Sequence, residues 1–121
     1  MVNVRIKPLS VNKCWAGRRF KTQNYKDYTE VLLHLLPDNY KVPDGDLKLI
    51  ATCGYSSKAA DIDNFLKPFI DVLQLKYNFN DSRIYCLRIN KVIVKKGEEF
   101  INFKLKNYEI KRKTKDLQVR E

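Results

Sequence analysis

The stretch SKAADIDNFLKPFIDVLQ, residues 57–74, places three carboxylates and a lysine on a strongly apolar segment. Asp61 and Asp63 stand one residue apart near its start, and Lys67 and Asp71 follow. The chain has 24 Lys and Arg against 14 Asp and Glu, a net charge of +10, so carboxylates are its scarcer charged groups. Three of them within eleven residues indicate a functional site as well as an element of the fold.

The apolar residues of this stretch recur at helical spacing and predict a helix from Asp63 to about Tyr77. Pro68 conflicts with a regular helix that begins at Asp63, because an interior proline removes a backbone hydrogen bond and costs about 3 kcal/mol. Either the regular helix begins near Lys67, with Pro68 in its first turn, or a distorted first turn leaves a carbonyl free. The predicted apolar face consists of Ile62, Phe65, Leu66, Phe69, Ile70, Leu73 and Tyr77, and the opposite stripe of Asp63, Lys67, Asp71 and Gln74.

Upstream of this stretch the pattern predicts a strand, a loop and a second helix. Alternating apolar residues predict a strand over 2–6, and a loop rich in Lys, Arg and Asn follows over 8–21. Thr22 can cap a helix that ends near Leu36, before Pro37. We expect Tyr25, Tyr28, Leu32 and Leu35 to form its buried stripe.

Three further strands are predicted over residues 47–54, 83–94 and 101–105, with a turn at Lys96-Gly97. The order strand, helix, strand, helix, strand, strand indicates one α/β (α+β) domain, a mixed sheet of about four strands with two main helices. We assign this domain to residues 1–106 and a basic C-terminal tail to residues 107–121.

The composition favours a globular nucleic-acid-binding protein. With 121 residues and 44% hydrophobic residues, the chain can bury one core. The excess of basic residues is typical of nucleic-acid binders, although a merely basic surface is the simpler alternative. Cys14, Cys53 and Cys86 show no zinc-binding spacing and fit a reducing compartment. No signal-peptide core or membrane span is visible, so we expect a soluble cytoplasmic protein. We also expect neither a membrane nor a small-molecule cofactor among its partners.

The acidic residues form a candidate metal site. Asp61 and Asp63 share one face if the chain there is extended, and Asp81 directly precedes the third strand. Clustered carboxylates repel one another, and Mg²⁺ would relieve that repulsion with the oxygen ligands it prefers. Lys67 could stabilise charge on a phosphate or pair with neighbouring acids. The simpler alternatives are a helix cap at Asp63, a helix-dipole contact at Asp61 and a turn at Asp81.

The N-terminal quarter carries a basic and aromatic segment. Lys and Arg bind phosphates, and an aromatic side chain such as Trp15 can stack on unpaired bases. The alternative is a solvated basic loop whose Trp15 folds into the core or a dimer interface. The candidate DNA-binding residues are Lys7, Asn12, Lys13, Arg18, Arg19 and Lys21.

Together these residues resemble the RusA family of Holliday junction resolvases, small endodeoxyribonucleases of bacteria and their phages. The similarity extends from about Ile6 to Val94 and includes KPLSVNKCW, residues 7–15, which is similar to the family's Pro-Ser-x-Asn opening. One departure is Asn80, because many members have a second acid before the one at Asp81. The central motif is matched by Asp61, Asp63, Asn64, Lys67, Asp71 and Leu73, followed by Asp81 ahead of Ile84.

The resemblance implies a site, a cofactor and partners. It implies Mg²⁺, with Mn²⁺ as a possible substitute, bound by Asp61, Asp63 and Asp81, and a catalytic Lys67. Asn64, Asp71 and Asn80 would support these residues. It also implies a homodimer that hydrolyses four-way branched DNA by paired symmetric nicks, in recombination, repair or phage genome processing within a bacterial cell or a phage-infected one. The alternative is a non-catalytic basic DNA-binding protein on the same scaffold.

Overall fold

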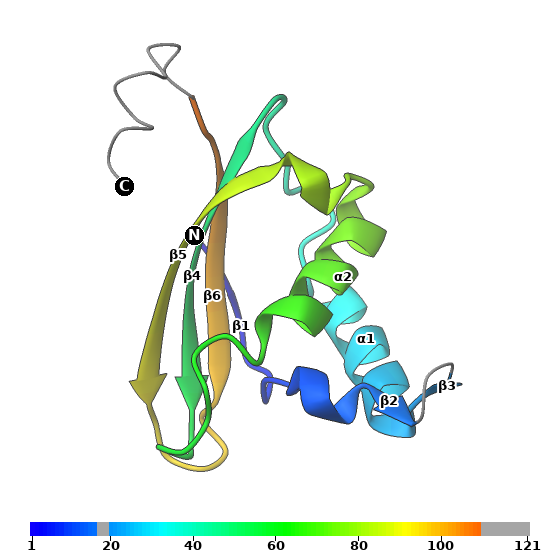
Figure 1. Ribbon diagram of the computed structural model, residues 1–121, viewed down its shortest axis with the longest axis vertical. Coiled ribbons are helices and arrows are strands. Elements are labelled where there is room, and N and C mark those ends of the chain that lie inside the picture. Colours follow the sequence, from blue (N-terminus) through cyan, green and yellow to red (C-terminus); the bar gives the residue numbers. More distant parts are fainter. Residues whose placement is uncertain (17–19, 110–121) are drawn as a thin grey trace, which may run out of the picture.

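The computed structural model describes residues 1–16 and 20–109, and these form a four-stranded sheet with two helices against it (Figure 1). The strand order is β1-β6-β4-β5, in which β4 and β5 are parallel and the other pairs are antiparallel. The predicted α/β (α+β) domain with a mixed sheet is therefore confirmed. The strands are β1 (Val2–Val4), β4 (Leu47–Tyr55), β5 (Ile84–Ile93) and β6 (Phe100–Asn107).

The helices are α1 (Gln23–Leu35) and α2 (Leu66–Tyr77), and both lie on the same side of the sheet (Figure 1). Thr22 caps α1 as predicted, since its Oγ1 accepts a hydrogen bond from the Tyr25 amide at 3.1 Å. A parallel strand pair needs a crossover connection, and α2 supplies it between β4 and β5.

The core fills the space between this side of the sheet and the helices. Phe69 of α2 packs edge-to-face on Phe103 of β6, with ring centroids 5.4 Å apart, and Phe65 lies 5.9 Å from Phe69. Alternate residues of the central strands point toward the helices and are buried: Leu47, Leu49, Ala51 and Cys53 from β4, and Ile101, Phe103 and Leu105 from β6.

The prediction that Leu35 and Ile62 are buried was wrong. Leu35 is 41% exposed while Leu36 is only 2% exposed. The helix ends at Leu35, so the extended backbone of Leu36, with ψ of 138°, turns its side chain inward. Ile62 is 45% exposed, because it lies in a turn before α2 and not on the helix.

The observed element bounds differ from the prediction in the connections. The predicted loop over 8–21 contains a short 3₁₀ helix, η1 (Val11–Lys13), and a hairpin of β2 (Trp15–Ala16) with β3 (Phe20–Lys21). A second 3₁₀ helix, η2 (Asp81–Arg83), precedes β5.

The first residues of the assigned tail adjoin the sheet. Asn107 is the last residue of β6, and the Tyr108 amide donates to the Asp46 carbonyl at 2.7 Å. Residues 110–121 of the assigned tail lie outside the described residues. Among the described residues, no helix has both the length and the apolar character needed to span a membrane.

Leu35 and Leu36 are neighbouring leucines of which only Leu36 is buried, so they give a matched pair of variants. Leu36→Ala should lower the free energy of unfolding by about 2–5 kcal/mol, because it leaves a cavity. Leu35→Ala should lower it by less than about 1 kcal/mol, because that side chain is largely in water. Urea unfolding measures both, and equal losses would contradict the observed end of α1.

Candidate functional site

Pro68 lies at the start of α2, beside the turn that carries the acids. It is the third residue of the helix, in the first turn, where the missing backbone N–H costs little. The first of the two predicted arrangements is therefore confirmed, since α2 begins at Leu66 with Pro68 in its first turn. The carbonyl of Asn64 precedes the N-cap residue Phe65, and it accepts from the Val11 amide of η1 at 2.9 Å.

Asp61 and Asp63 lie in the turn between β4 and α2, and both side chains are exposed. We call residues 57–65 the acid turn. Asp63 is not the helix cap, since Phe65 holds that position. The carbonyls of Asp61 and Asp63 accept from the amides of Asn64 and Leu66, at 3.2 and 3.1 Å.

Lys91 of β5 ties the acid turn to the sheet. Its Nζ donates to the carbonyl of Lys58 at 3.0 Å and also to the carbonyl of Ala60. The half-buried ammonium thus holds the backbone directly before Asp61. Together with Val11 on η1, it fixes the acid turn from two separate elements.

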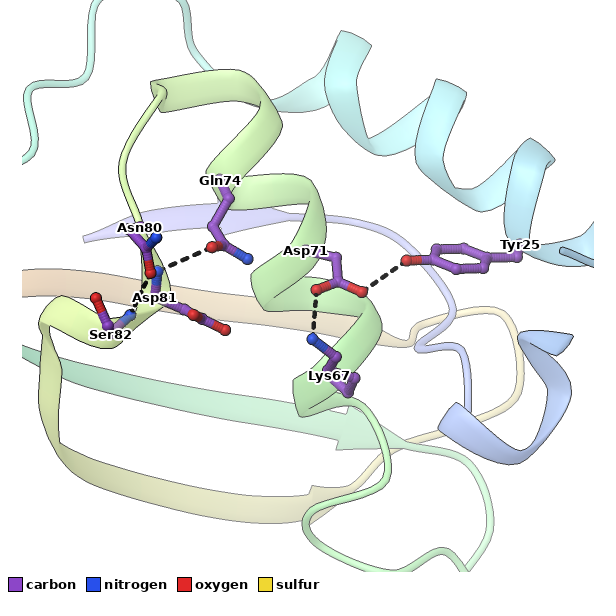
Figure 2. A network of polar contacts seen from close by, with 7 residues as sticks. All are labelled: Tyr25, Lys67, Asp71, Gln74, Asn80, Asp81 and Ser82. Atoms are coloured by element: carbon purple, nitrogen blue, oxygen red, sulfur yellow. Dashed lines mark hydrogen bonds and ion pairs between the residues drawn. The ribbon is translucent and has the colours of Figure 1, made fainter. Parts of the chain in front are cut away.

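Lys67, Asp71 and Gln74 lie along one side of α2, which we call the polar stripe. Side chains of this stripe take part in a connected set of contacts (Figure 2). Lys67 Nζ donates to Asp71 Oδ1 at 2.9 Å, and the Tyr25 hydroxyl donates to Asp71 Oδ2 at 2.8 Å. Burial raises the pKa of the Tyr25 hydroxyl, and the hydrogen bond to Asp71 raises it further. The phenol therefore stays protonated and remains a donor. Both carboxylate oxygens of Asp71 are thus engaged within the fold, as expected for a partner of Lys67.

Asp81 approaches the same stripe from η2. Its backbone amide donates to Gln74 Oε1 at 2.8 Å, and Figure 2 shows its carboxylate extending toward the Lys67 side of α2. The hydrogen bond to Asp71 raises the pKa of Lys67, and the charge of Asp81 acts in the same direction. Asn80 caps η2, because its Oδ1 accepts from the Ser82 amide at 2.8 Å.

The donor set suits a hard cation in its chemistry but is not assembled as a compact cluster. Within residues 1–16 and 20–109, no three His, Cys, Asp or Glu side chains are grouped closely enough to hold a metal ion. The ion pairs in this part of the chain, Lys67–Asp71 and Lys76–Asp38, leave out Asp61, Asp63 and Asp81. Mg²⁺ prefers such carboxylate oxygens, so these three residues could serve as its ligands. That they bind Mg²⁺ together stays a prediction.

The predicted basic segment lies beside this region. Asn12 and Lys13 are exposed on η1, and Ser10 caps η1 by accepting from the Asn12 amide at 3.2 Å. Lys7 and Lys13 line an open cavity of about 580 Å³ that Asn64 of the acid turn also lines. Arg18 and Arg19 lie outside the described residues.

The hairpin connects to the polar stripe through Tyr25. Lys21 Nζ lies 5.1 Å from the Tyr25 ring centroid, and Trp15 packs edge-on against the same ring at 6.1 Å. Trp15 is nevertheless 45% exposed, so it is neither a core residue nor fully in solvent. One tyrosine therefore contacts the basic hairpin through its ring and Asp71 through its hydroxyl.

The sequence did not identify Tyr25, Gln74 and Lys91 as site residues. Tyr25 was assigned to the core from helical spacing, and its ring is indeed buried. Only its hydroxyl gives it a second role, and hydroxyl partners cannot be read from periodicity. Lys91 offered no local signal, because its contacts lie more than thirty residues away in the chain.

No known family model matches this chain, and no curated protein matches it significantly. The similarity to the RusA family therefore depends on the quoted residues alone.

The Lys67–Asp71 pair gives a prediction in solution. Asp71→Asn should lower the pKa of Lys67, because it removes the acceptor that favours the charged ammonium. A pH titration of the Lys67 side-chain resonances by NMR measures this. Asp38→Asn, which breaks the separate pair with Lys76, should leave the Lys67 titration unchanged. An unaltered pKa in Asp71→Asn would show that the pair does not form in solution.

The contacts of Lys91 predict the local stability of the acid turn. Lys91→Met should raise the hydrogen-exchange rates of the Ala60 and Asn64 amides about 10- to 100-fold, because a charge-assisted hydrogen bond contributes about 1.5–3 kcal/mol. Hydrogen exchange followed by NMR measures this, with the exposed Lys95→Met as the control. Unchanged protection in Lys91→Met would show that the acid turn holds its shape without this side chain.

Proposed function

We propose that the chain is a Mg²⁺-dependent endodeoxyribonuclease that resolves four-way DNA junctions by paired symmetric nicks. The observation that carries the proposal is the division among the acids of the motif. Asp71 has both oxygens engaged by Lys67 and Tyr25. Asp61, Asp63 and Asp81 take part in neither ion pair of the described residues. A structural role thus accounts for Asp71 and leaves the other three available to a cation.

The proposed roles follow from these positions. Asp61, Asp63 and Asp81 would hold Mg²⁺, which when bound supplies a Lewis acid for phosphodiester hydrolysis and lowers the pKa of water. The Lys67 ammonium would stabilise the negative charge that develops on the phosphate. Asp71 and Tyr25 are positioning residues, because they hold Lys67 on the exposed side of α2.

The basic segment supports DNA as the substrate. Lys7, Lys13 and Lys21 are exposed near the acid turn or the polar stripe. Their charges would attract the phosphate backbone toward a site that is itself acidic. Two matched nicks on a two-fold symmetric junction require two sites, and a homodimer with two-fold symmetry supplies them.

A non-catalytic DNA-binding protein is the second candidate. It is favoured by the structural use of Asp71, since an ion pair and a hydrogen bond already explain one acid of the motif. In that case Asp61 and Asp63 would only repel the phosphate backbone. Replacing both with Asn would then strengthen DNA binding and alter no cleavage.

The two candidates differ in junction cleavage. The purified protein with Mg²⁺ should nick a synthetic four-way junction at symmetric positions and leave a linear duplex of the same sequence intact. Asp63→Asn and EDTA should each abolish the nicks, and Lys67→Met should slow them about 10²–10³-fold, as expected for the loss of an electrostatic stabiliser.

Asp44→Asn serves as the control, because this exposed acid lies in the connector between α1 and β4. The Asp44→Asn variant should cleave the junction at the wild-type rate. Strand mapping on denaturing gels gives the nick positions. Binding of the junction without cleavage in either Mg²⁺ or Mn²⁺ would reject the nuclease in favour of the DNA-binding protein.

A further inference from the structure

The sheet has a second face, which neither helix covers. Both helices lie on one side of the sheet (Figure 1), and side chains alternate between the two sides along each strand. On β4 the residues Leu47, Leu49, Ala51 and Cys53 point toward the helices, so Lys48, Ile50 and Thr52 point to the other side. We call this other side the open sheet face.

The register of the strands arranges the open sheet face in rows. Paired residues of neighbouring strands point to the same side, so the pairing extends each row from β4 onto β6 and β5. The rows are Lys48 with Lys106 and Cys86, Ile50 with Lys104 and Arg88, and Thr52 with Asn102 and Asn90; Asn3 of β1 continues the last row from Asn102.

The charge of the open sheet face has one sign. Lys48, Arg88, Lys104 and Lys106 lie on it, and no Asp or Glu occupies any of the strand positions in these rows. The ion pairs of the described residues include none of these cations. Lys48 also lies directly opposite Lys106, and like charges in that position destabilise a sheet. The arrangement is therefore unfavourable for folding by itself and suits an external anion.

The spacing and the remaining side chains fit a sugar-phosphate backbone. Lys104 and Lys106 are two residues apart on β6, which is about 7 Å along a strand. One DNA strand rises about 3.4 Å per phosphate along the duplex axis, so with β6 aligned to that axis this spacing would correspond to about two nucleotides. The neighbouring row contributes the exposed amide of Asn90 and the partly buried Thr52; amide and hydroxyl side chains commonly contact phosphate and sugar.

We propose that the open sheet face binds the backbone of duplex DNA, as a surface separate from the acid turn and the polar stripe of α2. A second copy of the chain would place these cations against their own counterparts, which disfavours a dimer through this face. The proposal does not require cleavage, because it concerns binding on the side of the sheet opposite the candidate nuclease site.

A pair of matched triple variants tests the proposal. Arg88→Gln, Lys104→Gln and Lys106→Gln together remove three exposed cations from the open sheet face. The control combines Lys41→Gln, Lys95→Gln and Lys96→Gln, three exposed cations elsewhere that carry the same total charge. Fluorescence anisotropy with a labelled linear duplex in EDTA, over a range of salt concentrations, measures affinity without any cleavage.

The face variant should bind at least about tenfold more weakly than wild type, with a salt dependence reduced by about one phosphate contact per lost cation. The control should change affinity less than about twofold, through net charge alone. Equal losses in the two variants would overturn the proposal. So would light scattering that shows the face variant to differ from wild type in oligomeric state.

Acetylation of the wild-type protein gives a second measurement that does not depend on the folding of any variant. Bound duplex should protect Lys48, Lys104 and Lys106 from an amine-reactive reagent, as read by mass spectrometry, and leave Lys41 and Lys96 reactive. Equal reactivity of the three lysines with and without DNA would also overturn the proposal. Because every assay is performed in EDTA, failure here is distinct from failure of the nuclease.

Discussion

A single backbone hydrogen bond connects the two halves of the candidate site. The carbonyl of Asn64 precedes the N-cap of α2 at Phe65, so it has no partner within the helix and accepts from the Val11 amide at 2.9 Å. This bond joins η1, with its exposed Asn12 and Lys13, to the turn that carries the acids. It provides a contact between segments that are distant in the sequence.

Packing of the core determines which side of α2 faces solvent. Phe69 is fixed against Phe103 of β6, and Val72 and Leu73 are fully buried beside it. With that side toward the sheet, the positions of Lys67, Asp71 and Gln74 must face outward. Two of them find a partner on another element: Asp71 on α1 through Tyr25, and Gln74 on η2 through the Asp81 amide. The packing of the hydrophobic core thus orients the polar stripe.

The sequence predicted the elements better than their ends, for physical reasons. Thr22 is a strong helix-capping residue, and burial alternates with a period of two over residues 47–53 of β4 and 100–105 of β6, so those features were predictable. Leu35 and Leu36 are both leucines at the end of a helix, and only the backbone angles there decide which one is buried. The hairpin of β2 and β3 has two residues in each strand, too few for any period to appear.

The site was predictable where one segment supplies the residues. The Lys67–Asp71 pair follows from helical spacing, whereas Tyr25 and Lys91 reach the region from elements far along the chain.

Strand alternation also separates the apolar side of the sheet, which packs against the helices, from the basic open sheet face. On β4 one set of positions forms the core beneath the helices and the other carries Lys48 on the open sheet face, and the chain then leaves the strand directly into the acid turn. A shift of one residue in register would exchange the two sets, which would bury lysine and expose leucine. The folding energy that protects the core therefore also holds the cations on one face. DNA binding through that face would depend on strand register, and metal binding would depend on the acid turn and η2. The two properties can therefore be altered independently, even though the same strand supports both.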